Sequence, residues 1–251
     1  MNATIPIPEG LWLILPYIAA TSFVLGHVWR YRFDQFGWTT RSSQIYESKL
    51  LQLGSPLFHF GMLGVFFGHV MGLLIPEAWT SAVGISEHAY HVVAVGAGSV
   101  AGLMVVAGVA ILCYRRIAIP SVRTNTSRND VLMYTLLTLA LVTGLLNTWG
   151  ANLLWGTYNY RETVSPWFRS LFSISPEPGL MVGVPWTFQL HGLVVLALVF
   201  AWPYTRLVHM FSAPIGYLTR PYIVYRRKEV ETKDKTRFAK AWDAPVTPDR
   251  W

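Results

Sequence analysis

Four histidines are the residues of this chain whose type and spacing are best suited to chemistry. His59 and His69 lie ten residues apart inside one apolar run, and His191 and His209 lie eighteen residues apart along the last apolar run. An imidazole in hydrocarbon is costly unless it has a partner. Four imidazoles on two such runs therefore indicate a bound ligand, and haem iron, which takes axial histidines, is the natural candidate.

Five apolar runs are long enough to carry these residues across a membrane. About 20 apolar residues are needed to cross roughly 30 Å of hydrocarbon as a helix. The runs occupy residues 11–29, 57–75, 90–114, 131–154 and 184–208. The composition, 53% hydrophobic and 13% charged, agrees with a membrane protein. Because the runs are continuously apolar, we predict an all-α bundle of five transmembrane helices and not a barrel of alternating strands.

Basic residues predict how the bundle is oriented. Lys and Arg gather in the connections after the first and third runs and after the last run, whereas residues 1–10 and 76–89 contain none. Since such residues accumulate on the cytoplasmic side, we expect the N-terminus outside and the C-terminus in the cytoplasm of a multi-pass protein of the cell membrane. The net charge of +7 follows from this asymmetry, so no nucleic-acid partner is predicted.

The remaining composition limits the domain organisation and the cofactor class. The sole cysteine, Cys113, excludes an internal disulfide, covalent haem attachment through CxxCH and cysteine-ligated iron–sulfur clusters. We expect one domain over residues 1–228, with a short surface helix in the long connection before the last run. A polar tail follows over residues 229–251, which is either disordered or docked on a cytoplasmic partner.

Helix geometry suggests how the four histidines pair. On an ideal helix His59 and His69 lie about 80° apart around the axis and about 15 Å apart along it. His191 and His209 are five full turns apart, about 27 Å, on one face. Matching depths on antiparallel runs pairs His69 with His191 on the outer side and His59 with His209 on the inner side. We therefore predict two stacked haems, with tilt absorbing the unequal rises.

Other interpretations of the same residues remain open. A single intramembrane histidine can simply bond to a neighbouring helix, and four could form a proton relay in a haem-free anchor or transporter. Zinc is disfavoured because the two pairs are too far apart for one four-coordinate site. Gly64, Gly68 and Gly72 lie on one helical face, which favours either tight helix packing or the close approach of a flat macrocycle. Two imidazoles per iron would leave no open position, which favours electron transfer over oxygen activation.

Two segments resemble a known family. They are SSQIYESKLLQLGSPLFHFGMLGVFFGHVMGLLIP, residues 42–76, and FQLHGLVVLALVFAWPYTRLVHMFSAPIGYLTRPY, residues 188–222. They are similar to the gamma subunit of membrane-bound respiratory nitrate reductase, a di-haem cytochrome b. The resemblance implies two b haems, with His69 and His191 as ligands of the outer, distal haem and His59 and His209 as ligands of the inner, proximal haem. It also implies partners: an iron–sulfur beta subunit and a molybdenum-containing alpha subunit that reduces nitrate.

The same resemblance implies a site near the outer haem that oxidises menaquinol or ubiquinol. Gly68 matches a glycine beside that quinol pocket. His88 and His91, at the outer start of the third run, are candidates to accept the quinol protons, and Tyr90 is a candidate hydrogen-bond partner of a quinone oxygen. All three can instead be solvated interface residues. The basic segments 115–128 and 220–228 could contact either the partner subunits or lipid, and a relative serving another quinone-linked reductase, such as a sulfite-reductase-associated or heterodisulfide-reductase-like complex, is the alternative.

Overall fold

The computed structural model describes residues 7–38, 42–154, 158–173, 175–212 and 219. The chain divides into two units, Met1–Ala213 and Pro214–Trp251, and only Thr219 of the second is described. The predicted tail at 229–251 and the basic segment 220–228 therefore lie outside the described residues. Everything that follows concerns the first unit.

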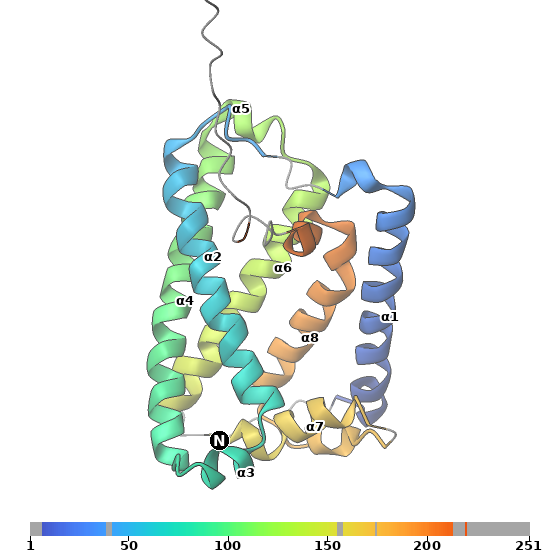
Figure 1. Ribbon diagram of the computed structural model, residues 1–251, viewed down its shortest axis with the longest axis vertical. Coiled ribbons are helices and arrows are strands. Elements are labelled where there is room, and N and C mark those ends of the chain that lie inside the picture. The colour runs from blue at the N-terminus through green and yellow to red at the C-terminus, as the bar shows by residue number, and fades with distance from the viewer. Residues whose placement is uncertain (1–6, 39–41, 155–157, 174, 213–218, 220–251) are drawn as a thin grey trace, which may run out of the picture. The chain divides into compact units, whose positions relative to one another are not determined.

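The described residues form helices joined by short turns and connections, and they contain no strand (Figure 1). In chain order the elements are α1 (Glu9–Phe33), η1 (Gln35–Gly37), α2 (Lys49–His69), η2 (Val70–Leu74), α3 (Glu77–Ala82), α4 (Glu87–Ala118), α5 (Pro120–Arg123), α6 (Arg128–Leu145), η3 (Leu146–Leu154), η4 (Tyr160–Glu162), α7 (Val164–Ser170), η5 (Pro178–Met181), α8 (Trp186–Ala201), η6 (Trp202–Tyr204) and η7 (Arg206–Ser212).

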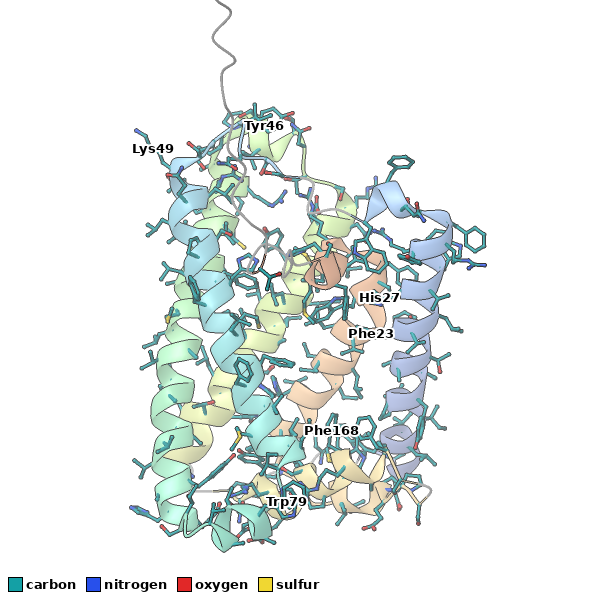
Figure 2. All side chains as sticks on the ribbon, viewed as in Figure 1. Phe23, His27, Tyr46, Lys49, Trp79 and Phe168 are labelled. Atoms are coloured by element: carbon teal, nitrogen blue, oxygen red, sulfur yellow. The ribbon has the colours of Figure 1, made fainter. Side chains whose placement is uncertain are left out.

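Five helices in the described part of the chain are long and apolar enough to cross a membrane, as predicted. They are Glu9–Phe33, Lys49–Leu74, Glu87–Ala118, Arg128–Gly150 and Trp186–Tyr204. Short elements close the two ends of the bundle. We call them the α5 end, where α2 begins at Lys49, and the α7 end, where α3 carries Trp79 and α7 carries Phe168 (Figures 1 and 2). The short helix predicted in the long connection is α7.

Local sequence signals set where the long helices start. The Ser86 side chain accepts a hydrogen bond from the Ala89 amide and caps α4. Ser127 and Asp130 cap α6 reciprocally, each side chain accepting from the other's backbone amide. Such caps satisfy amides that the first helical turn leaves without partners.

Glycines bring α2 and α4 together along their length. A Cβ added at Gly61 would stand 2.8 Å from the Val105 amide nitrogen, and one at Gly108 would stand 2.5 Å from that of Phe58. A Cβ at Gly64 would meet that of Ala101 at 2.9 Å, whereas one at Gly68 would have no atom within 4 Å. Of the two roles considered for the glycine stripe, helix packing thus accounts for Gly64, and it does not account for Gly68.

The last predicted span differs from the observed structure. Residues 184–208 are predicted as one helix, with His191 inside it and His209 at its end, five turns apart on one face. Instead α8 ends at Ala201 and gives way to the 3-10 turns η6 and η7. Pro203 explains the break, because proline has no amide hydrogen and its ring clashes with the carbonyl four residues earlier. The single-helix geometry was therefore wrong, and His209 lies on a separate turn.

Candidate functional site

The four histidines form two facing pairs. The rings of His59 on α2 and His209 on η7 have centroids 6.1 Å apart with their planes at 68°, and we call these residues the α5-end pair. The rings of His69 on α2 and His191 on α8 also lie 6.1 Å apart, with planes at 35°, and form the α7-end pair. These are the two pairs that matching by depth predicts.

Hydrogen bonds fix the tautomer of the two α2 histidines. Nδ1 of His59 lies 2.7 Å from the Ser55 carbonyl oxygen, and Nδ1 of His69 lies 2.8 Å from that of Val65. A carbonyl only accepts, so each Nδ1 carries the hydrogen and donates it. In the neutral form, a ring with its hydrogen on Nδ1 has its lone pair on Nε2 for a metal, and the bond to Nδ1 orients the ring as in known metal sites.

In the other two histidines Nδ1 also carries the hydrogen, but it donates to different kinds of acceptor. Nδ1 of His209 donates to the Arg206 carbonyl. Nδ1 of His191 lies 3.0 Å from the Thr143 hydroxyl, which gives its own hydrogen to backbone carbonyls, that of Leu139 at 2.8 Å among them. The Thr143 oxygen must therefore accept from His191. In the neutral form, all four rings would thus carry the lone pair on Nε2.

This donor set fits the axial ligation of haem iron. A centroid separation of 6.1 Å accommodates one metal ion bonded at about 2 Å to a nitrogen of each ring. No group of three or more His, Cys, Asp or Glu in the described ranges could hold a metal ion. Pairs of imidazoles alone suit a metal whose other ligands come from a macrocycle.

His27 on α1 is not part of either pair. Its ring contacts Phe23, Trp38 and Phe211, and its Nδ1 lies 2.6 Å from the Phe23 carbonyl (Figure 2). Its Nε2 is buried and has no hydrogen-bond partner. With aromatic rings and no second imidazole opposite, it lacks the arrangement that the other four share.

A polar pocket of about 360 Å³ lies at the α7 end. Three candidates from the sequence, His88, Tyr90 and His91, line it together, and Gly68 does not. The rest of its lining is Glu87, Ala94, Val95, Asn147, Thr148, Tyr158, Asn159, Tyr160, Arg161 and Phe188. Its size and its mixture of aromatic and polar groups suit a small organic ligand.

A buried arginine organises this pocket. Arg161 is 4% exposed, and its guanidinium donates to the Glu87 carboxylate at 2.9 Å and to the Thr80 hydroxyl at 3.0 Å. The same group lies 3.9 Å from the centroid of the Tyr90 ring, a cation–π contact. Burial, and then the neighbouring Tyr90, raise the pKa of Tyr160 well above its ordinary value, so its hydroxyl stays protonated.

Sequence reasoning did not identify Arg161 or Tyr160 as site residues. The carboxylate that Arg161 pairs with is 74 residues away, so no local sequence pattern predicts this contact. The available signal was an arginine next to aromatic residues in a connection that otherwise has few charges.

The pocket adjoins the α7-end pair. Phe188 lines the pocket and lies one turn before His191 on α8. Asn147, another lining residue, follows one turn after Thr143, the hydrogen-bond partner of His191. The Tyr160 hydroxyl lies 2.7 Å from where a Cβ of Gly72 would stand, just beyond His69. A ligand in this pocket would therefore be near that imidazole pair.

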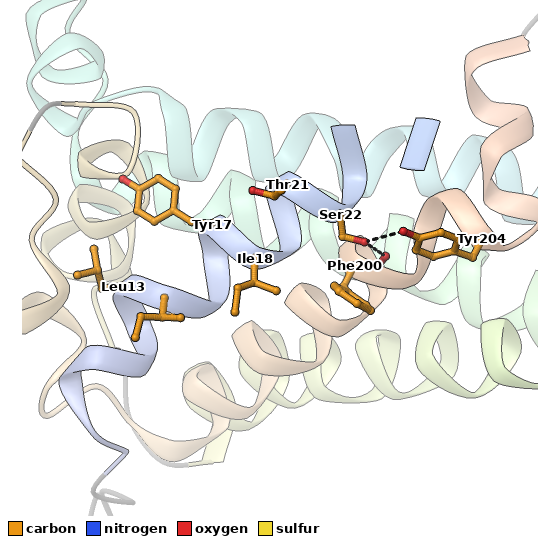
Figure 3. A pocket seen from close by; sticks show the side chains of 8 residues that line it. Leu13, Tyr17, Ile18, Thr21, Ser22, Phe200 and Tyr204 are labelled. Atoms are coloured by element: carbon orange, nitrogen blue, oxygen red, sulfur yellow. Dashed lines mark hydrogen bonds between the residues drawn. The ribbon is translucent and has the colours of Figure 1, made fainter. Parts of the chain in front are cut away.

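A larger apolar groove lies between α1 and α8 (Figure 3). It has a volume of about 690 Å³ and is lined by Leu13, Ile14, Tyr17, Ile18, Thr21, Ser22, Phe200 and Tyr204. The lining includes none of the predicted site residues and no histidine or carboxylate. Size alone therefore does not mark the site in this molecule.

Part of the basic segment predicted to face partners or lipid is turned inward. Arg115 is 2% exposed and is bonded to the Glu47 carboxylate and to Ser43. Arg123 and Arg128 are exposed and remain available to a partner or to lipid headgroups. The prediction for segment 115–128 is therefore wrong for Arg115, because that side chain bonds to the connection between α1 and α2.

Comparisons with known proteins identify the family of this chain. Residues 9–228 match the family described as nitrate reductase gamma subunit. The nitrate reductase gamma chain of Bacillus subtilis is 46% identical over 218 residues, 87% of this chain and 97% of that protein. The respiratory nitrate reductase 1 gamma chain of Escherichia coli is 33% identical over 217 residues, 86% of this chain and 95% of that protein.

A more similar relative is longer. The nitrate reductase-like protein NarX of Mycobacterium tuberculosis is 54% identical over 222 residues, 88% of this chain but 34% of that protein. The match therefore spans about a third of the length of that relative. The family match nevertheless covers most of this sequence and both histidine pairs. The chain belongs to the nitrate reductase gamma subunit family.

Proposed function

We propose that this chain is the quinol-oxidising, di-haem cytochrome b subunit of a respiratory nitrate reductase. The observation that carries the proposal is the presence of two imidazole pairs, each ring hydrogen-bonded through Nδ1, which leaves Nε2 as the nitrogen that can bind a metal. Neither a proton relay nor a haem-free anchor explains why four rings should be paired and should all be hydrogen-bonded through Nδ1.

In this proposal His69 and His191 hold the distal haem, and His59 and His209 hold the proximal haem. The chemistry that bound haem supplies is the acceptance and release of one electron at a time. The protein contributes the ring orientation, through the Nδ1 hydrogen bonds. It also contributes the spacing, because α2 carries one ligand of each pair.

The pocket at the α7 end is the proposed quinol site. Oxidation of a quinol releases two electrons and two protons, and the protons need acceptors. His88 and His91 are suited to receive them, because the ordinary pKa of imidazole lies near neutral pH. Tyr90, held over Arg161, and Tyr160, kept protonated by burial, can hydrogen-bond the quinol oxygens. The family resemblance places Gly68 beside the quinol pocket, although Gly68 is not among the residues that line this one.

The proposed orientation places the α7 end outside and the α5 end in the cytoplasm. The arginines near the α5 end support it, because Lys and Arg accumulate on the cytoplasmic side of membrane spans. Electrons would leave at the α5 end to an iron–sulfur beta subunit and then to a molybdenum-containing alpha subunit that reduces nitrate. Moving each electron inward against the membrane potential costs about 2.3 kcal/mol per 100 mV. The reaction would therefore conserve part of its free energy as membrane potential.

The test is to purify the chain with its associated subunits from native membranes and follow its absorption as a reduced quinol is added. We expect a b-type haem spectrum that quinol reduces and nitrate reoxidises. A preparation with full subunit content but no haem would refute the cytochrome proposal. Reoxidation by sulfite or a disulfide, and not by nitrate, would favour the alternative reductases.

A further inference from the structure

His209 differs from the other three paired histidines because no long helix carries it. It lies on η7, a short 3-10 segment that follows the break at Pro203. Helix register therefore does not set the direction of its ring. Something else must hold this turn in place, and the contacts of η7 show what it is.

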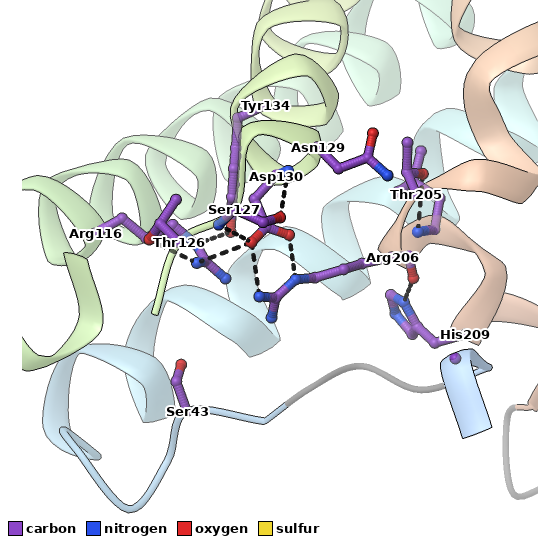
Figure 4. A network of polar contacts seen from close by, with 12 residues as sticks. Ser43, Arg116, Thr126, Ser127, Asn129, Asp130, Tyr134, Thr205, Arg206 and His209 are labelled. Atoms are coloured by element: carbon purple, nitrogen blue, oxygen red, sulfur yellow. Dashed lines mark hydrogen bonds and ion pairs between the residues drawn. The ribbon is translucent and has the colours of Figure 1, made fainter. Parts of the chain in front are cut away.

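A buried ion pair anchors η7 to the start of α6 (Figure 4). Both oxygens of Asp130 accept from Arg206, Oδ1 from Nε and Oδ2 from Nη2 at 2.8 Å. Asp130 is 2% exposed and also caps α6 with Ser127. Arg116 is a second cation, 3.9 Å from Asp130. A two-point contact of this kind fixes the Arg206 side chain in direction as well as in distance.

The anchored residue is also the one that holds the His209 ring. The Arg206 carbonyl accepts the Nδ1 hydrogen of His209, so one residue bonds to Asp130 through its side chain and to His209 through its backbone. Beside it, the Asn129 amide donates to the Tyr204 carbonyl and ties the preceding turn to α6. The structure shows a continuous chain of contacts from Asp130 to the imidazole.

We propose that Asp130 and Arg206 are positioning residues for His209, and that they set the redox potential and ligand-field signature of the haem held by the α5-end pair. This inference rests on the proposed function. A hydrogen bond from Nδ1 gives the imidazole more anionic character and so favours the ferric state. If the anchor is lost, η7 shifts, that hydrogen bond weakens and the ferric state is less favoured.

The experiment compares Asp130→Asn with Arg128→Gln, a change of an exposed arginine two residues away on the same helix. In Asp130→Asn we expect the one-electron equilibrium of the α5-end haem to shift about tenfold toward the ferrous state, about 59 mV. The low-spin electron paramagnetic resonance signal of that haem should change as well. The other haem, and both haems in Arg128→Gln, should keep their potentials and signals.

Two further variants separate positioning from general support. Asp130→Glu keeps the carboxylate and should restore most of the potential. Arg206→Lys keeps the cation and the backbone carbonyl but loses the two-point contact, so it should shift the same haem by less. If the Asp130→Asn variant does not assemble, the Arg206→Lys variant is used to measure the potential of the α5-end haem.

Different results would overturn this inference and the proposed function. Unchanged potential and signal of the α5-end haem in both Asp130→Asn and Arg206→Lys would overturn the inference, as would equal shifts of both haems. A wild-type protein that holds no haem would instead refute the proposed function, and this inference with it.

Discussion

The two imidazole pairs have the same centroid separation, 6.1 Å, and reach it by different means. At the α7 end both rings come from long helices, so their positions follow from helix register. At the α5 end one ring comes from a short turn that an ion pair with α6 anchors. The planes differ accordingly, at 35° and 68°. Equal spacing thus does not require equal construction, and the two sites should respond to different mutations.

The surroundings of the pairs differ in the same way. The α7-end pair adjoins a polar pocket that includes two histidines and three tyrosines. The α5-end pair adjoins the ion pairs of Asp130 with Arg206 and Arg116. Under the proposed function the first end exchanges electrons and protons with a small molecule, and the second passes electrons to a protein.

The largest expected effects come from removing one ligand of each pair. His191→Ala should abolish only the α7-end haem and stop quinol oxidation, and His209→Ala should abolish only the α5-end haem. Haem content and redox titration of the purified variants measure this. If both variants lost the same haem, the pairing would be wrong.

Arg161→Gln should affect only the α7 end. It removes the charge that holds Glu87 and lies over Tyr90, a loss of about 1.5–3 kcal/mol, so kcat/KM for quinol should fall roughly tenfold to a hundredfold. Haem content should not change. Arg123→Gln, an exposed arginine at the opposite end, is the matched control. Equal quinol kinetics in the two variants would remove Arg161 from the site.

Gly108→Ala should weaken haem binding at both imidazole pairs. The added carbon would push against Phe58 on α2, and α2 carries one ligand of each pair. The new methyl group would stand 2.5 Å from the Phe58 amide nitrogen, so we expect a loss of about 1–3 kcal/mol in stability. Gly96→Ala, on the same helix, is the control, since Gly96 is exposed and no atom lies within 4 Å of the added carbon. Thermal release of haem measures the difference, and equal midpoints would contradict the packing described.

The smallest expected effect is that of Thr143→Val. This change keeps the size of the side chain but removes the oxygen that accepts from His191, a hydrogen bond with a net contribution of about 0.5–1.5 kcal/mol. The potential of the α7-end haem should rise, and that of the α5-end haem should stay unchanged. A shift confined to the α5-end haem would reverse the assignment.

Much of the fold could be predicted from apolar run length, since crossing a bilayer requires a minimum helix. The histidine pairs could be predicted from depth on antiparallel runs. The unequal rises between them, about 15 Å and about 27 Å on ideal helices, were assigned to tilt. The structure instead breaks the last helix at Pro203. That proline was visible in the sequence and was not used.

The pocket was harder to predict than the imidazole pairs. His88, Tyr90 and His91 lie within about one turn at the start of α4, so their shared location follows from the sequence. Arg161 and Tyr160 reach them from a distant connection, and no periodicity reports such a contact. The depth of burial that raises the pKa of Tyr160 likewise depends on tertiary packing.

The most direct test of the central claim is a haem analysis and redox titration of the purified wild-type complex. The account predicts b-type haem at two per chain, titrating as two separate one-electron steps. A complex with intact subunits that carries a single haem, or none, would contradict it.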